Sequence, residues 1–440
     1  MLSGIVNAAE KTTGTATERN MPFLRVTGGY IVNSRGEDVL FRGINFGNWL
    51  LWEGGSLGIP NYAEHILRNK MEAKIEKKKV DLFFELIRKY HTTKEDFITA
   101  KAEGLNVIRL CFHYRYVKEK PTELDQAVRW AKWAGIYIIL NHHAAPGSQA
   151  PAYFADSDGT ARLWDSPEYQ EEYIKSWEIL AERYRDEPAV AGYEILNEPA
   201  GEGWKVTDLY KRTVARIRKI DRRHIIFLDG NSYAGDPSVL DPPFDDNVVY
   251  MCHHYEESVD EMDRWIHKQG WITFRDKYKV PIMCSEYHFN RGCDEYFERE
   301  GIHWSPWIHQ KLSDRWRKWI ENTGRMKKEK RGELRNIRIQ FVNKSELSDG
   351  IKMKIVNFLN DRHPGDMNEF FRNIAKENSK EQLKLKSLRE RFSRMEEDYW
   401  IDSFADTINK MSEEKMEEFI KDIRDRTGRQ FTSDGFRYGD

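Results

Sequence analysis

The sequence predicts an α/β fold, a (β/α)8 TIM barrel, followed by a charged helical appendage. From residue 39 onwards, eight short apolar runs alternate with amphipathic segments of helical length. The runs are almost continuously apolar, which is typical of parallel strands that helices cover on both faces. The 286 residues from 39 to 324 also suit eight β/α units, because such barrels usually need about 250.

The predicted strands follow one another at intervals that leave room for a helix after each. They are residues 39–46, 106–112, 137–143, 191–198, 224–230, 248–255, 281–287 and 301–307. Helical patterns occupy the gaps, and two of them begin at potential N-caps, Thr122 and Ser166, the second followed by Pro167. Residues 313–324 would form the last helix of the barrel.

Two further segments account for the remaining length of this part of the chain. Residues 69–91 are predicted to form a helix inserted between the first two strands. Residues 23–43, before the barrel, have the pattern of a hairpin. We expect this hairpin to cover the bottom end of the barrel.

The chain is expected to divide into three regions. These are a flexible leader (1–20), the barrel (21–324) and a helical region (325–440) with 49 charged residues in 116. In the last region, apolar residues from Leu385 to Met411 recur every three or four positions with one shift of phase, which indicates amphipathic helices. We expect these helices to pack on one another or on the barrel, although they also offer a surface for a partner.

The overall charge is nearly balanced, with 70 Lys and Arg against 72 Asp and Glu. This balance gives no electrostatic reason to expect nucleic acid or a membrane surface as the main partner. No apolar run approaches the roughly 20 residues of a membrane span, and the leader lacks the basic start and apolar core of a secretory signal. The localisation is open: the chain is cytoplasmic or the mature form of a secreted protein. Its four cysteines show no paired spacing and are expected to be reduced.

Polar residues gather where the predicted strands end. In a barrel of this kind the C-terminal strand ends form one shared mouth, which is where such enzymes react. The residues at or near these ends are Arg109, Asn141, His142, His143, Asn197, Glu198, His253, His254, Tyr255, Glu286, Tyr287 and Trp304. A purely structural barrel has little reason to place so many of them on one rim.

Glu198 and Glu286 have the arrangement that a retaining glycosidase needs. One carboxyl group must donate a proton to the leaving oxygen and the other must attack the anomeric carbon, with the pair about 5 to 5.5 Å apart. The two residues are 88 positions apart, close to three average β/α units, so they should face one pocket. Arg109 can hold Glu286 ionised while Glu198 keeps its proton, and Asn197 is placed to bind a sugar hydroxyl.

Six motifs in order along the chain, "NVIRL", "LNHHAAPGSQ", "YEILNEP", "CHHY", "CSEY" and "GIHWSPW", resemble glycoside hydrolase family 5. The resemblance covers roughly residues 24–324 and is nearest to the branch of exo-β-1,3-glucanases and related bacterial β-glucanases. It implies Glu198 as acid/base and Glu286 as nucleophile. The implied substrate-binding residues are Arg109, His143, Asn197, His253, Tyr255 and Trp304, the last as the stacking platform for the sugar. It implies a β-glucan or β-linked oligosaccharide as substrate and no metal or organic cofactor.

Two positions depart from the family pattern. Asn141 stands where the branch commonly has Asp, and Pro306 interrupts the aromatic run at strand eight. Within the family, an endo-β-1,4-glucanase or mannanase is the alternative to a glucosidase. Two alternatives lie outside the family. One is a metal-dependent barrel hydrolase, which usually needs a His-x-His pair on the first strand that this chain lacks. The other is a non-catalytic glycan-binding barrel with a partner-binding helical tail.

Overall fold

The fold is described from a computed structural model, for residues 21–117, 121–255, 258–288, 291–307, 312–324, 328–361 and 366–426. The predicted leader, 1–20, lies outside the described residues. The chain forms two compact units that do not follow its order. The first contains residues up to 52, 92–311 and from 426 onwards, and the second contains 53–91 and 312–425. The predicted boundary after residue 324 falls inside the second unit.

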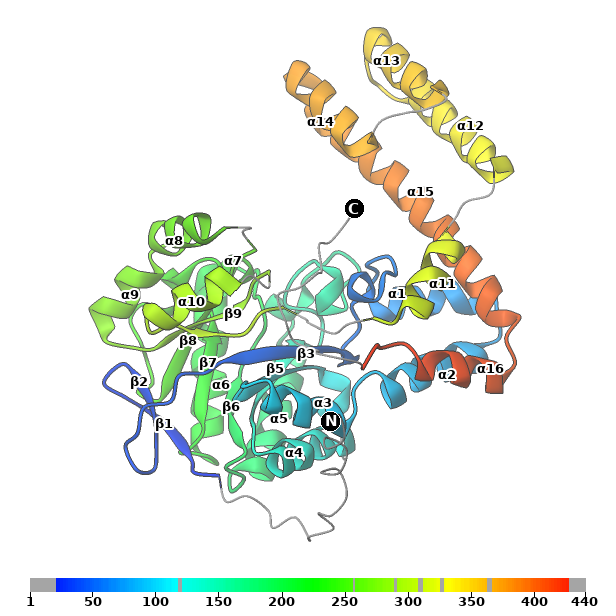
Figure 1. The fold of residues 1–440 in the computed structure, drawn as a ribbon. Coiled ribbons are helices and arrows are strands. Elements are labelled where there is room, and N and C mark those ends of the chain that lie inside the picture. The colour runs from blue at the N-terminus through cyan, green and yellow to red at the C-terminus, as the bar shows by residue number, and fades with distance from the viewer. Residues whose placement is uncertain are drawn as a thin grey trace, which may run out of the picture. The chain divides into compact units, whose positions relative to one another are not determined.

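The first unit is a (β/α)8 barrel, as predicted. Its eight strands are parallel and lie in chain order, each paired with its neighbour (Figure 1). They are β3 (Gly43–Leu50), β4 (Val107–His113), β5 (Tyr137–Ala144), β6 (Val190–Glu194), β7 (Ile225–Asp229), β8 (Val248–His253), β9 (Ile282–Glu286) and β10 (His303–Trp304). The last strand is much shorter than the seven residues predicted for it.

The barrel closes between its first and last strands through few backbone contacts and one side chain. Arg42, just before β3, forms an isolated parallel bridge with Trp304. The buried Asn45 amide then donates to the carbonyl oxygens of Ser285, Ser305 and Pro306 at 2.8–3.0 Å. A side-chain amide therefore replaces part of the backbone hydrogen bonding between β3 and β10. Proline has no N–H to donate, but the Pro306 carbonyl accepts one of these hydrogen bonds.

The lower interior of the barrel is apolar. Its inward-facing side chains include Val107, Ile139, Phe227 and Met251, and a hairpin of β1 (Leu24–Thr27) and β2 (Tyr30–Asn33) adds Leu24 and Ile31 to the same cluster. The Val26 N–H also donates to Asn247, the residue before β8. The hairpin thus covers the amino ends of the strands, as predicted.

Helices of the first unit lie outside the strands (Figure 1). They are α3 (Lys94–Ala102), α4 (Thr122–Ala134), α5 (Pro167–Tyr184), α6 (Gly203–Arg218), α7 (Asn231–Ala234), α8 (Val259–Lys268), α9 (Trp271–Tyr278) and α10 (Arg291–Arg299). Ser166 caps α5 as predicted, whereas Thr122 is the first helical residue of α4 and not its cap. The helix predicted after β8 is broken at Gly270, whose φ of +88° ends it and separates α8 from α9.

The second unit joins the insertion after β3 to the C-terminal third of the chain. The insertion forms two helices, α1 (Glu64–Glu72) and α2 (Lys77–Tyr90), where one was predicted. The C-terminal part forms α11 (Asp314–Gly324), α12 (Lys328–Lys344), α13 (Asp349–Asn360), α14 (Met367–Glu377), α15 (Gln382–Asn409) and α16 (Glu413–Lys421). Helix α11, predicted as the last barrel helix, belongs to this unit.

Helix α15 explains the shift of phase in the apolar pattern. Its first half buries Leu385, Leu388 and Phe392 in a cluster with side chains of α12, α13 and α14. Its second half buries a different face, on which Phe404 contacts Phe83 of α2. One continuous helix therefore serves two separate cores, and the stripe must rotate between them.

Replacing Phe404 by Ala is expected to lower the free energy of unfolding of the second unit by about 3–5 kcal/mol, because a fully buried ring leaves a cavity among Phe83, Trp319 and Trp400. Denaturant unfolding followed by tryptophan fluorescence measures the change. Leu383→Ala, on the exposed side of the same helix, is the control and should change little. Equal effects of the two variants would contradict the packing described here.

Candidate active site

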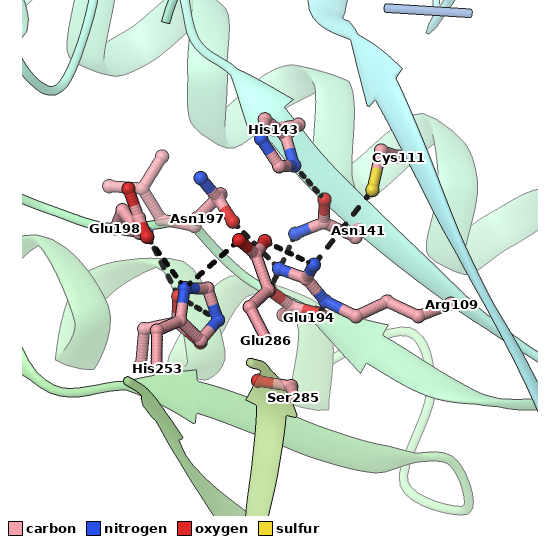
Figure 2. A network of polar contacts seen from close by, with 12 residues as sticks. Arg109, Cys111, Asn141, His143, Glu194, Asn197, Glu198, His253, Ser285 and Glu286 are labelled. Atoms are coloured by element: carbon pink, nitrogen blue, oxygen red, sulfur yellow. Dashed lines mark hydrogen bonds and ion pairs between the residues drawn. The ribbon is translucent and has the colours of Figure 1, made fainter. Parts of the chain in front are cut away.

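Above the apolar layer, the inward-facing positions of the barrel become polar. Side chains two residues apart on a strand face the same side. The next inward-facing residue after Val107 is therefore Arg109, and the next after Phe227 is Asp229. The polar layer comprises Asn45, Arg109, Asn141, Glu194, Asp229 and His253, all buried. Figure 2 shows most of them converging on one point, together with Asn197, Glu198 and Glu286.

Arg109 is the centre of this layer. Its guanidinium donates two hydrogen bonds to Glu194, at 2.5 and 2.6 Å, and one to Glu286, at 2.6 Å. The remaining donors reach the side-chain oxygens of Asn45 and Asn197 at 2.8 and 2.7 Å. Burial alone would lower the pKa of Arg109, but the charges of Glu194 and Glu286 raise it well above its ordinary value. The guanidinium is therefore a permanent positive charge with its orientation fixed from both sides.

Glu286 ends β9 and faces the interior because the strand contains a bulge. Cys252 pairs with Cys284, but His253, the next residue of β8, pairs with Glu286. The Tyr255 hydroxyl donates to one oxygen of Glu286 at 2.5 Å, and Arg109 donates to the other. Burial raises the pKa of Glu286, and these two donors oppose the rise because they bind the carboxylate form.

Glu198 lies beyond the end of β6 in a left-handed backbone conformation, with φ at +42°. This conformation is unusual for a residue other than glycine and must be held by its surroundings. The Glu198 N–H donates to the Asp229 carboxyl group at 2.8 Å, and Glu198 Oε1 lies 2.7 Å from His253 Nδ1. One oxygen of Glu198 and one of Glu286 lie within 4.8 Å of each other, with His253 between them.

Two groups around Glu198 have pKa values that are shifted in favour of their neutral forms. Burial, together with the Arg109 charge, lowers the pKa of His253 well below its ordinary value. Burial raises the pKa of Asp229 well above its ordinary value, and the Glu194 charge adds to the rise. These shifts favour neutral forms of His253 and Asp229 beside Glu198, whereas Glu286 contacts the full positive charge of Arg109.

The amide side chains orient the site without adding charge. The Asn141 amide nitrogen donates to Glu194 at 2.5 Å, and its side-chain oxygen accepts from His143 Nδ1 at 2.6 Å. An ionised Asp at this position would repel Glu194, so Asn141 suits a site that already holds two carboxylates. The Asn197 Nδ2 atom has no hydrogen-bond partner among the described residues.

Of the eight predicted site residues, seven gather at this mouth and Trp304 does not. Trp304 is buried in the cluster between the sheet and the outer helices, level with Cys284. Trp307, three residues later, stacks on His143 instead, with ring centroids 5.3 Å apart. The prediction of Trp304 as the exposed sugar platform therefore does not fit its position, because the β10 strand turns that side chain outward. His142 and His254 make packing contacts with Tyr173 and Trp265, as their outward position on the strands implies.

Sequence reasoning missed Glu194, Asp229 and Asn45. Each lies within a predicted strand and before its last residue, whereas the site residues were sought at the strand ends. The sequence does mark them, because each is a polar residue in an otherwise apolar strand. Each also lies at a position that faces the barrel interior, as the predicted site residues do. The bulge in β9, by contrast, leaves no such trace.

The donor atoms of Glu198, His253 and Glu286 are close enough to surround a metal ion, as are those of Glu194, Asp229 and His253. The contacts argue against such use. Both oxygens of Glu286 already accept hydrogen bonds from Arg109 and Tyr255, and the Arg109 charge would repel a cation. These contacts favour a substrate that hydrogen-bonds over a metal ion at Glu286.

Comparison with known proteins agrees with this geometry. The family model described as cellulase (glycosyl hydrolase family 5) matches residues 69–322. The chain belongs to glycosyl hydrolase family 5. Over an alignment 342 residues long, it is 35% identical to a protein named beta-xylosidase from Phanerodontia chrysosporium. The match covers 66% of this chain and 71% of that protein.

More distant matches carry other names. A probable glucan 1,3-beta-glucosidase A of Emericella nidulans is 28% identical over 51% of this chain, which spans 59% of that relative. The solved structure of AoRut shares the fold with a TM-score of 0.52 at 14% identity, covering 62% of this chain and 89% of that chain. Within the residues that the structure describes, every helix is too short or too polar to cross a bilayer.

Removing the charge of Arg109 is expected to destabilise the barrel by about 3–5 kcal/mol, because Glu194 and Glu286 would remain buried without a cation. Burial already raises the pKa of Glu286 and Arg109 opposes that rise, so in Arg109→Met this pKa rises further and the loss should be larger at pH 7 than at pH 5. Denaturant unfolding at the two pH values measures it. Arg35→Met, at an exposed ion pair, is the control, and a loss independent of pH would refute the charge argument.

Proposed function

We propose that the protein is a retaining β-glycosidase that cleaves β-linked glucosides or short β-glucans by double displacement. The observation that carries this proposal is the spacing of two carboxyl groups. One oxygen of Glu198 lies within 4.8 Å of one of Glu286, and retaining enzymes hold the two groups about 5–5.5 Å apart, whereas inverting enzymes need about 6.5–9.5 Å.

In the first step Glu286 attacks the anomeric carbon and forms a glycosyl ester. Glu198 gives its proton to the glycosidic oxygen as the bond to the leaving group breaks. In the second step Glu198, now a carboxylate, takes a proton from water. The water oxygen attacks the same carbon and Glu286 leaves, which restores both groups and retains the configuration of the sugar.

The contacts of the two residues support this division of roles. Arg109 and Tyr255 donate to Glu286, which favours the ionised form that a nucleophile requires. Glu198 lies beside the neutral His253 and can carry the proton that a general acid requires. The Asn197 amide, with a donor to spare, suits the sugar hydroxyl next to the reacting carbon.

Asp229 is proposed as a positioning residue for Glu198. It accepts the N–H of Glu198 and lies 3.6 Å from His253 Nε2, so it contacts both the acid and the histidine beside it. Holding a left-handed residue in place costs free energy that a backbone hydrogen bond helps to offset. Trp307, which stacks on His143 at the mouth, is the proposed platform for the sugar in place of Trp304.

A β-xyloside is the second candidate substrate. The relative with 35% identity carries the name beta-xylosidase, whereas those named for glucan activity are near 28%. Hydrolysis of matched aryl β-glucosides, β-xylosides and β-mannosides, followed by laminari-, cello- and xylo-oligosaccharides, ranks the candidates. The products over time separate exo from endo cleavage.

Glu286→Gln is expected to abolish hydrolysis of every substrate, because no nucleophile remains. Glu198→Ala should lose about 10²- to 10⁴-fold on oligosaccharides, yet retain formation of the glycosyl ester from aryl glycosides whose leaving group needs no proton. Burst kinetics and the anomer of the first product, followed by NMR, measure both effects.

Three measurements on the unmodified enzyme separate the alternatives. Inhibition by EDTA that added metal reverses would favour a metal-dependent hydrolase, and inversion of the anomer would reject double displacement. Turnover of no glycoside, with binding of glycans intact, would favour the non-catalytic barrel.

Tyr255→Phe is expected to move the acidic limb of the kcat/KM profile to higher pH. The Tyr255 hydroxyl lowers the pKa of Glu286, so its loss raises that pKa further and leaves less carboxylate at low pH. Tyr233→Phe, at another exposed tyrosine of the first unit, is the control and should leave the limb in place. An unchanged or lowered limb in Tyr255→Phe would contradict the proposed role of Glu286.

A further inference from the structure

The charge of the C-terminal region is segregated along the chain. Residues 325–395 contain 19 Lys and Arg against ten Asp and Glu, whereas residues 396–440 contain seven against 13. The nearly neutral total therefore conceals a basic part and an acidic part. The basic part comprises α12, α13, α14 and the first half of α15, and we call these helices the basic arm (328–361 and 366–395).

The acidic part already has its partners within the second unit. Lys70 and Lys74 of the insertion pair with Asp398 and Asp402, and Lys89 of α2 pairs with Glu417. These contacts use the acidic charge to join the two pieces of the unit. The basic arm is built around an apolar cluster of its own.

All the charged residues that line one groove of the basic arm are cations. It has a volume of about 240 Å³ and lies between α14 and α15. Its charged residues are Arg372, Lys376, Lys386 and Arg389, and its other lining residues are Phe371, Ala375, Gln382 and Leu385. Each cationic pair is three or four residues apart on its helix, so its members face the same side.

These cations have no compensating anion among the described residues. Arg372, Lys376, Lys386 and Arg389 make no ion pair there, although Lys354 pairs with Glu377 close by. Four like charges around one groove repel each other, and a bound anion would relieve that repulsion. The groove is therefore suited to a ligand with more than one negative charge.

The lining favours carboxylated sugars over nucleic acid. Single-stranded nucleic acid sites combine cations with exposed aromatic rings for the bases, and the one ring here, Phe371, is buried. The apolar floor and the Gln382 amide suit the apolar face and the hydroxyl groups of a pyranose. Arginine forks match carboxylate geometry.

From these observations we infer that the groove between α14 and α15 binds an acidic polysaccharide, one whose uronic acid residues carry a carboxylate on each sugar. This site would hold the protein on a charged glycan matrix while the barrel acts on neutral β-linked chains. The choice of a glycan rests on the proposed function, but the binding itself does not require catalysis.

Binding of the full-length Glu286→Gln variant to polygalacturonate, measured by affinity electrophoresis and titration, tests this inference. We expect saturable binding that weakens as salt rises, since ion pairs at an exposed groove are screened. Changing Arg372, Lys376, Lys386 and Arg389 together to Gln should weaken it at least tenfold. The same groove substitutions in the active enzyme should leave hydrolysis of a short aryl glycoside unchanged.

The matched control changes four lysines of α12 and α13, Lys330, Lys344, Lys352 and Lys354, to Gln. It removes the same charge from the basic arm but leaves the groove intact, so its binding should fall less than threefold. Equal losses in the two variants, absence of polygalacturonate binding, or tighter binding of duplex or single-stranded DNA would overturn the inference. Binding without any glycoside hydrolysis by the unmodified enzyme would reject the proposed function and leave the groove in place.

Discussion

The arrangement of the barrel mouth depends on one buried guanidinium. Arg109 contacts side chains from β3, β6, β9 and the segment after β6, so four parts of the chain are oriented by a single cation. A buried cation is costly unless its hydrogen bonds are completed. Two of the groups that complete them, Glu286 and Asn197, are those that contact the substrate in the proposed mechanism. Satisfying Arg109 and shaping the site are therefore the same physical task, which ties activity to the folding of the barrel.

Much of the barrel follows from the sequence, because its pattern is repeated eight times. Continuous apolar strands, helix-length gaps and polar strand ends together identify the fold and place Glu198 and Glu286 at one mouth. Local caps such as Ser166 also follow from a few adjacent residues. Each of these features depends on short-range rules that a single sequence displays.

What the sequence did not predict depends on register and on distant partners. The bulge in β9 turns Glu286 inward, and the register of the short β10 turns Trp304 outward. A shift of one residue in a strand moves a side chain to the opposite face of the sheet. The grouping of residues 53–91 with the C-terminal helices depends on contacts such as Phe83 with Phe404. Amphipathic helices show that a partner is needed but not which one.

The mixed origin of the second unit has a consequence for how the protein is made. Phe83 leaves the ribosome 321 residues before Phe404, the ring it contacts. At about 5–20 residues per second, synthesis of that stretch takes on the order of tens of seconds. During that time the apolar face of α2 lacks the partner that covers it in the finished unit. Helper proteins that shield nascent chains would find their target in this insertion, well before translation ends.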